Sequence, residues 1–143
     1  MQYNLDKGAH SVFSLRYHLV IVTKYRRKVF TKWYITKTLK EKVLEISSWY
    51  GVEIIAQETD QDHIHILFKC SPKLIMTKYI NVLKGVTSRT LRTRFPEIKR
   101  IIWKNCLWSP SYCLLTTGEV KIWQVKKYVE NQGKNNGTRS HKK

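Results

Sequence analysis

Hydrophobic and polar positions along the chain alternate in short segments that are typical of β-strands. Residues 52–58 (VEIIAQE) and 63–69 (HIHILFK) are two such segments separated by the polar turn TDQD, which predicts an antiparallel hairpin. Residues 12–23 (VFSLRYHLVIVT) form another run rich in β-branched and aromatic side chains. Residues 107–115 (LWSPSYCLL) indicate a further strand after an irregular start. The pattern therefore predicts four strands.

Three other segments have the spacing of three and four between apolar residues that favours a helix. The first begins at the N-cap residue Thr31 and ends at Gly51. The second begins at Ser71-Pro72 and ends at Phe95-Pro96, and the third covers residues 119–132. The side chains predicted to face the core are Ile35, Leu39, Val43, Ile46 and Tyr50 in the first helix, Ile75, Tyr79, Leu83 and Val86 in the second, and Ile122, Val125 and Val129 in the third.

The predicted order of elements is β-α-β-β-α-β-α. This order is typical of the ferredoxin-like split βαβ fold, an α+β class with an antiparallel sheet and helices on one face, here with an additional C-terminal helix. We expect one domain over residues 1–132. Residues 133–143 (GKNNGTRSHKK) contain no apolar side chain and are expected to form a disordered basic tail.

Charge narrows the class of partner. The 143 residues include 27 Lys and Arg against 10 Asp and Glu, a formal net charge of +17. The tail holds four of these cations, so about +13 belongs to the predicted domain. A hydrophobic content of 42% supports a folded core. A folded and strongly basic domain favours a polyanion, with nucleic acid the leading candidate, over a small-molecule substrate.

Cysteine usage and hydropathy indicate the compartment. Three cysteines with no CxxC pair fit neither a disulfide framework nor a zinc ribbon, so we expect reduced thiols. The first residues lack the apolar core of a signal peptide, and the longest apolar run, residues 19–22, is far too short to span a bilayer. We therefore expect a soluble cytoplasmic protein with no membrane partner.

The first candidate chemical motif is His63-Ile64-His65. Side chains alternate along a strand, so both imidazoles point to one face, with their Cα atoms about 7 Å apart, and can converge on one ion. The opposite face carries Ile64, Ile66 and Phe68 and is free to pack on helices. A surface strand with two solvated histidines explains the motif equally well, and both interpretations remain open at this point.

The second candidate motif lies in the last predicted helix. Tyr128 and Gln132 are four residues apart, so their side chains lie one above the other on one helical face. A phenol and an amide oxygen placed in this way can serve one reaction centre. A half-buried tyrosine and a solvated helix end form the simpler interpretation, which is favoured for an arbitrary Tyr-x-x-x-Gln pair.

Four segments, in order and spacing, carry a family resemblance: HLVIVTKYRRKVF, DHIHILF, WSPSYCLLTTG and KKYVENQGKN. Together they resemble the small single-tyrosine HUH transposases of bacterial and archaeal insertion sequences, the TnpA type. The resemblance runs from His18 to Gln132, and the HUH signature (His, hydrophobic, His) is met by His63, Ile64 and His65. The segment CLLTTG that follows Tyr112 departs from the family, where aromatic or small residues are commoner. This departure changes no candidate catalytic residue.

This resemblance implies a reaction and a ligand set. In such enzymes two histidines and a glutamine, here His63, His65 and Gln132, hold one Mg²⁺ or Mn²⁺ ion at the scissile phosphate of single-stranded DNA. The tyrosine, here Tyr128, attacks the phosphorus and forms a 5′-phosphotyrosine. The family also implies subterminal DNA hairpins as the binding targets and a homodimer with shared active sites, in which the tyrosine helix acts in cis or in trans. Ligand type alone does not choose the metal, because imidazole suits zinc or manganese better than magnesium.

Basic residues near aromatic side chains are the candidate DNA contacts, because cations bind phosphates and aromatic rings stack on bases. A solvated face is the simpler interpretation of each cluster. The predicted DNA-binding residues are Lys24, Tyr25, Arg26, Arg27 and Lys28 after the first strand, Arg89, Arg92 and Arg94 at the end of the second helix, and Lys126 and Lys127 beside the tyrosine.

Three alternative functions are compatible with parts of the pattern. A domesticated HUH nickase acting on chromosomal repeat hairpins would have the same residues and would differ in genomic context. A non-catalytic RRM-like nucleic-acid-binding module shares the element order, yet its RNP1 run is replaced here by His-Ile-His-Ile-Leu-Phe. A zinc hydrolase would use the two histidines, but the chain has neither HExxH nor a cysteine pair.

Overall fold

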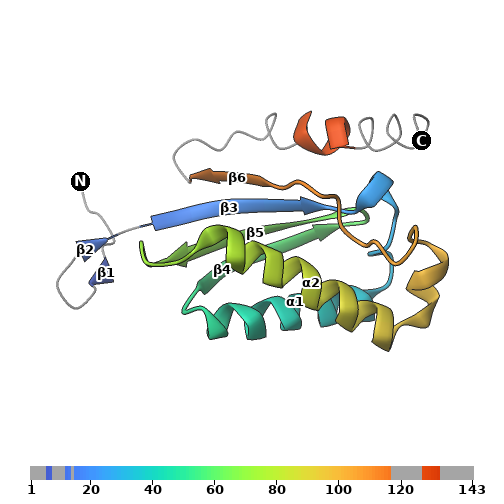
Figure 1. The fold of residues 1–143 in the computed structure, drawn as a ribbon, viewed down its shortest axis with the longest axis horizontal. Helices are drawn as coiled ribbons and strands as arrows, with labels where there is room; N and C mark the ends of the chain where they lie inside the picture. Colours follow the sequence, from blue (N-terminus) through green and yellow to red (C-terminus); the bar gives the residue numbers. More distant parts are fainter. Residues whose placement is uncertain (1–5, 8–11, 14, 117–126, 133–143) are drawn as a thin grey trace.

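Four antiparallel strands form the central sheet of the computed structural model, which describes residues 6–7, 12–13, 15–116 and 127–132. Their order is β4-β5-β3-β6, so the first long strand of the chain lies between the third and the last (Figure 1). This is the strand order of the ferredoxin-like fold, and the α+β prediction is confirmed. The elements are β1 (Asp6–Lys7), β2 (Val12–Phe13), β3 (Leu15–Val22), the 3-10 turn η1 (Lys24–Arg26), α1 (Trp33–Trp49), β4 (Glu53–Asp60), β5 (His63–Cys70), α2 (Met76–Arg94), the 3-10 turn η2 (Pro96–Arg100) and β6 (Cys113–Thr116).

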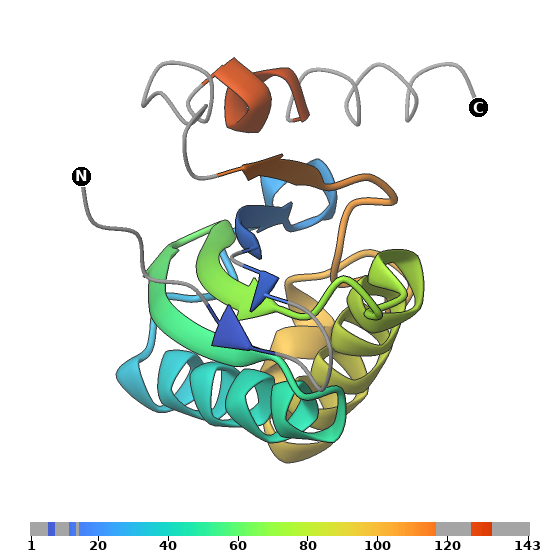
Figure 2. The same ribbon diagram turned by 90° about the vertical axis from the view of Figure 1, so that its left-hand side faces the viewer.

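Helices α1 and α2 pack side by side on one face of the sheet, as Figure 2 shows. Burial alternates along β5, where Ile64, Ile66 and Phe68 are fully buried beneath the helices. The predicted stripe of α1 is confirmed from Ile35 to Ile46. Together these side chains form the main core, and the period-two pattern of β5 leaves its remaining residues for the other face of the sheet.

The helical residues 127–132 lie on that other face, beyond β6 and away from α1 and α2 (Figures 1 and 2). There Val129 is buried against Val20 and Val22 of β3, with Cys113 and Tyr128 packed around them. The sheet therefore has helical structure on both faces, with the C-terminal helix on the face opposite the main core. The predicted segment 119–126 of this helix, with Ile122 and Val125, lies outside the described residues, as does the predicted tail 133–143.

Both helix starts differ from prediction. Helix α1 begins at Trp33 with Lys32 as its N-cap, and no side chain caps it, so Thr31 does not have the predicted role. Helix α2 begins at Met76, because Ser71 closes a turn instead: its Oγ accepts the amide of Lys73 at 3.1 Å. The consequence is that Ile75, predicted to face the core, precedes the helix and is 64% exposed.

Two of the four predicted strands are shorter than predicted. The run 12–23 is divided, because Val12–Phe13 pairs with β1 and only Leu15–Val22 belongs to the main sheet. In the run 107–115 the ladder with β3 begins at Cys113, although Trp108 forms an isolated bridge with Thr23. All three cysteines are free, as expected. In the part of the chain that the structure describes, no helix is long and apolar enough to cross a membrane.

Candidate active site

The two histidines of β5 lie on the sheet face opposite the main core. His63 and His65 alternate with the fully buried Ile64 and Ile66, and both are half-buried. The register of the sheet places them opposite Val22 and Val20 of β3, respectively. The predicted common face of the histidines is therefore observed.

His63 is held by a carboxylate that an arginine also binds. Its Nδ1 donates to Asp62 Oδ1 at 2.8 Å, and Arg26 Nε donates to Asp62 Oδ2 at 2.9 Å. Asp62 is only 8% exposed. Burial by itself raises the pKa of this carboxyl, but the hydrogen bonds from His63 and Arg26 and the guanidinium charge outweigh it and hold the pKa below its usual value. The carboxylate fixes the His63 ring and leaves Nε2 available to a ligand.

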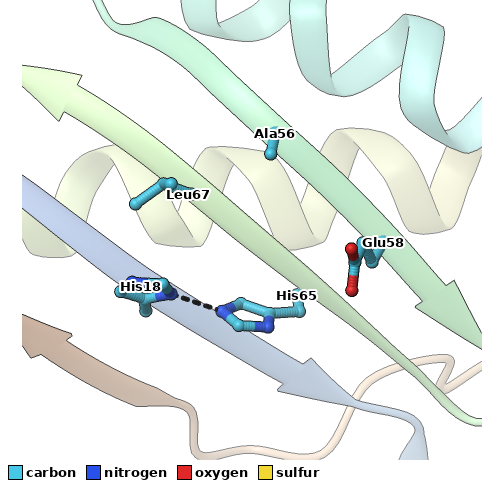
Figure 3. Close-up of a pocket in the computed structure, with 5 residues that line it drawn as sticks. All are labelled: His18, Ala56, Glu58, His65 and Leu67. Atoms are coloured by element: carbon cyan, nitrogen blue, oxygen red, sulfur yellow. Dashed lines mark hydrogen bonds between the residues drawn. The ribbon is translucent and has the colours of Figure 1, made fainter. Parts of the chain in front are cut away.

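His65 has a different partner, the imidazole of His18 on β3. His18 Nδ1 and His65 Nε2 are 2.6 Å apart, with one ring donating to the other (Figure 3). The two rings line a cavity of about 160 Å³ with Ala56, Glu58 and Leu67. Burial lowers the pKa of both imidazoles, and for His65 the neighbouring His18 lowers it further. The pair therefore favours neutral rings, the form that binds a metal ion.

The C-terminal helical segment brings the second motif to the same face. The Tyr128 hydroxyl lies 3.2 Å from Ser111 Oγ, and Gln132 Oε1 accepts a hydrogen bond from Ser109 Oγ at 2.7 Å. Burial raises the pKa of the Tyr128 phenol, an effect that the Ser111 hydrogen bond partly offsets. In this arrangement Tyr128 is a neutral phenol at pH 7.

One strand connects the two motifs. The backbone amide of Ser109 donates to the carbonyl of Val22 at 2.8 Å, and Val22 is the register partner of His63. The residue that holds Gln132 is thus bonded to the strand neighbour of His63. The His-x-His and Tyr-x-x-x-Gln motifs, more than 60 residues apart in the sequence, lie on one face over adjacent strands.

The segment around Ser109 is anchored to helix α2 on the opposite side. Trp108 Nε1 donates to Thr87 Oγ1 at 3.0 Å, and Lys84 Nζ donates to the carbonyl of Ser109 at 2.7 Å. Burial lowers the pKa of the Lys84 ammonium. These buried contacts fix the segment that holds the tyrosine helix, so α2 supports the candidate site without reaching it.

The predicted DNA-binding residues separate into three groups. The first group, residues 24–28 around η1, lies next to the site, and Arg26 contacts it directly through Asp62. The second group lies on α2, in the helical layer of the opposite face; there Arg92 donates to its own helix at Ser88. Lys127 is exposed, whereas Lys126 lies outside the described residues.

The donor set of the site fits a divalent ion. Among the described residues, no three or more His, Cys, Asp and Glu side chains gather in a way that could hold a metal, so a three-residue site requires the amide oxygen of Gln132. His63 Nε2 and His65 Nδ1 take no part in the contacts described above, and the Gln132 oxygen has a second lone pair. Two imidazole nitrogens and one amide oxygen are ligands that a divalent transition ion or magnesium accepts.

Four residues of this site were not among those predicted from sequence: His18, Asp62, Ser109 and Ser111. Each contacts a predicted residue, and for all but Asp62 the contact joins distant segments, with a sequence separation of 47 residues for His18 and His65. The adjacency of Asp62 to His63 is the one signal in the sequence that pointed to such a partner, because an aspartate beside a ligand histidine is a common orienting group.

Comparisons with known proteins give matches over most of the chain. A family model described as "Transposase IS200 like" matches residues 11–132. The chain is 34% identical over 128 residues to the ISDra2 transposase TnpA of Deinococcus radiodurans, covering 90% of this chain and 91% of the relative. It is 29% identical over 126 residues to the transposase for insertion sequence element IS200 of Salmonella typhimurium, covering 87% and 80%.

Solved structures show the same fold. A crystal structure of a Deinococcus radiodurans R1 protein assigned as a transposase superimposes with a TM-score of 0.82 at 35% identity, over 89% of this chain and 97% of that one. A REP-associated tyrosine transposase bound to a REP hairpin has a TM-score of 0.54 at 12% identity, over 87% of this chain and 68% of that one. The second likeness concerns the fold alone.

Proposed function

This chain belongs to the family of IS200-like transposases, and from that premise we propose that it is a metal-dependent enzyme that cleaves and rejoins single-stranded DNA through a 5′-phosphotyrosine. Membership in this family answers the question that the element order left open, since an RRM-like module would share the order but not the family. The substrate would be the ends of an insertion sequence.

One observation carries the proposal: the phenol of Tyr128, the amide of Gln132 and the imidazoles of His63 and His65 belong to one face of the sheet. In this proposal Tyr128 is the nucleophile, and the two histidines and Gln132 are the metal ligands. Asp62 and His18 orient the two imidazoles, and Ser109 orients the amide. A Mg²⁺ or Mn²⁺ ion bound there would withdraw charge from the scissile phosphate.

The covalent step exchanges one ester for another. The Tyr128 oxygen forms a bond to phosphorus as the bond from phosphorus to the 3′-oxygen of the preceding nucleotide breaks; the phenol proton leaves to solvent, and the departing oxygen takes up a proton to become a 3′-hydroxyl. Because burial raises the pKa of Tyr128, the phenol keeps its proton until the substrate is in place. A 3′-hydroxyl from another strand can reverse the attack, so rejoining needs no nucleotide cofactor.

Charge supports single-stranded DNA as the partner. The net charge of +17 favours a polyanion, and the basic residues around η1 lie beside the candidate site. The hairpin that one structural neighbour binds leads us to extend the proposal to subterminal hairpins as the recognised element. We further propose a homodimer with shared active sites, in which the tyrosine helix of one subunit serves the histidines of either subunit.

A strand-labelling experiment tests this function. Single strands covering the DNA on each side of the coding sequence, labelled at the 5′ or the 3′ end, are incubated with the full chain and Mg²⁺ or Mn²⁺. We expect the 5′-labelled strand to give a shorter free product with a 3′-hydroxyl. The 3′-labelled strand should migrate with the protein, and His63→Ala should abolish both products.

The matched control is Tyr50→Phe, because Tyr50 is another half-buried tyrosine but lies at the end of α1 on the opposite face. This control should cleave like the wild type. Cleavage without metal at the wild-type rate, or a 3′-labelled product free of protein, would contradict the proposed chemistry. Strand joining after addition of a second 3′-hydroxyl end separates a transposase from a nickase.

A further inference from the structure

Two aromatic rings meet beside the candidate active site and are surrounded by cations. The rings of Tyr25 and Trp103 lie edge to face, with their centroids 5.9 Å apart. The Lys24 ammonium lies 5.5 Å from both centroids, the Arg27 guanidinium 5.8 Å from Tyr25, and the Lys104 ammonium 4.8 Å from Trp103. We name these five residues the aromatic cluster.

Both turns that present the cluster have an unusual backbone. Tyr25 and Arg26 have φ of 58° and 52°, and Lys104 and Asn105 have φ of 47° and 59°; among the described residues these are the non-glycine residues with positive φ. Such conformations are costly for residues other than glycine and gather at ligand sites. The second turn is closed by a hydrogen bond of 2.8 Å from the amide of Cys106 to the carbonyl of Trp103.

The cluster is fixed to the site by buried contacts. Thr23 is fully buried, and its Oγ1 donates to the carbonyl of Arg27 at 2.7 Å while its backbone amide donates to the carbonyl of Asp62 at 2.9 Å. The amide of Lys24 donates to the carbonyl of Leu107 at 2.9 Å, which joins the two turns. The cluster is thus rigidly placed one residue from Arg26, whose guanidinium reaches His63 through Asp62.

A role in folding alone does not account for these features. Trp103 is 36% exposed and does not belong to the buried core, and Lys104 is exposed. In the described part of the chain, no carboxylate forms an ion pair with Lys24, Arg27 or Lys104. Three cations over two accessible rings favour a ligand that offers both a flat apolar face and negative charge.

We propose that the aromatic cluster is a stacking site for one unpaired base of single-stranded DNA, with Lys24, Arg27 and Lys104 on the phosphates that flank this base. The proposal rests on the proposed function for its substrate class. The base would replace the Lys104 ammonium over the indole of Trp103, and the released ammonium would pair with a phosphate. Because the aromatic cluster lies next to Arg26, a base stacked there would hold the DNA strand close to the histidines.

The stacking contact is tested by removing the Trp103 ring from the protein and, separately, the bases from the DNA. Binding of the full-length wild type and Trp103→Ala is measured by fluorescence anisotropy on fluorescein-labelled dT20 and on an abasic 20-mer that keeps every phosphate. We expect Trp103→Ala to weaken binding of dT20 by about 5- to 160-fold, the range for loss of one stacked base. On the abasic strand the change should be less than twofold, because no base remains to stack.

Three further variants keep the result interpretable. Trp103→Phe retains a ring and should restore dT20 affinity to within about threefold of the wild type. Trp33→Ala, which removes another exposed indole (74%) with an edge contact to Tyr34, should leave both affinities unchanged. Lys104→Ala should reduce the slope of log K against log salt by about 0.7, the value for one phosphate of a single strand, whereas Trp103→Ala should leave the slope unchanged.

The outcomes separate this proposal from the proposed function. Equal losses on dT20 and on the abasic strand, or no loss on either, would overturn the stacking site, even if the same preparations cleave DNA through Tyr128. A selective loss on dT20 in a protein that forms no DNA adduct would leave the stacking site standing and overturn the cleavage chemistry. Failure of the wild type to bind dT20 would overturn the stacking proposal itself.

Discussion

Replacement of Asp62 by asparagine tests the arrangement around His63 with a minimal change of shape. Asp62 is 8% exposed and accepts from two donors, His63 Nδ1 at 2.8 Å and Arg26 Nε at 2.9 Å. An asparagine has one acceptor oxygen, so its NH₂ group must face one of these two donors. The variant therefore loses one hydrogen bond and the charge that assists both.

The expected loss of metal affinity follows from the role of Asp62 as an orienting group for His63. Loss of such a partner lowers metal affinity by about 10- to 100-fold, which is about 1.4 to 2.7 kcal/mol. The cost in folding is at the low end of the range for a charged hydrogen bond, about 1.5 kcal/mol, because the Arg26 side chain is 39% exposed and water can replace the lost acceptor. Metal affinity should therefore fall in a protein that is still folded.

Isothermal titration calorimetry with Mn²⁺ measures the affinity, and urea unfolding without metal measures the stability. Glu41→Gln is the matched control, because Glu41 is an exposed carboxylate on α1 that pairs with Lys37 at 3.8 Å on the opposite face. The control should bind Mn²⁺ as the wild type does. If Asp62→Asn keeps Mn²⁺ affinity within twofold of the wild type, the carboxylate does not orient a metal ligand.

Two further predictions concern the scaffold. Tyr79 is fully buried, its hydroxyl is hydrogen-bonded to Ser47 at 2.7 Å, and burial raises the pKa of its phenol to about 12. Because the folded state holds this proton more tightly than the unfolded state, the contribution of Tyr79 to the free energy of unfolding is fully present below pH 10. About 1.4 kcal/mol of that contribution is lost by pH 11. Tyr79→Phe should lower the free energy of unfolding by about 1 kcal/mol at pH 8, because the hydrogen bond is lost. Near pH 11 the variant and the wild type should have the same free energy of unfolding, measured with urea. A difference in stability of the same size at both pH values would refute this. Thr87→Val leaves the buried indole N–H of Trp108 without its acceptor and should lower the free energy of unfolding by about 1 to 3 kcal/mol; an unchanged urea midpoint would show that Trp108 is not anchored there.

The order of elements and the burial of the sheet were predictable because they depend on local periodicity. The alternation in β5 fixed which side chains face the core, and the spacing of three and four fixed the stripe of α1. The start of α2 was not predictable in the same way. Ser71 satisfies its hydrogen bonds in a turn as well as it would at a helix N-cap, and only the tertiary structure selects between the two.

The candidate reactive groups were proposed from sequence, and the structure places them on one face of the sheet, whereas most of their contact partners were not predicted. His63, His65, Tyr128 and Gln132 stand in short motifs with a fixed spacing. Apart from Asp62, which directly precedes His63, their partners come from segments that are distant in sequence, as with Gln132 and Ser109, 23 residues apart. The aromatic cluster combines residues from two loops in the same way. Only the residues around Tyr25 were predicted to contact DNA, and the pairing of Trp103 with Tyr25 depends on the tertiary structure.

In the proposed reaction Tyr128 becomes covalently joined to DNA. The most direct measurement is peptide mass spectrometry of the full chain after reaction with an element end and Mg²⁺, followed by nuclease digestion. We expect a nucleotide attached through its 5′-phosphate to Tyr128 in the wild type and in Tyr50→Phe, and no adduct in Tyr128→Phe. An adduct on another residue, or one that persists in Tyr128→Phe, would show that Tyr128 is not the nucleophile.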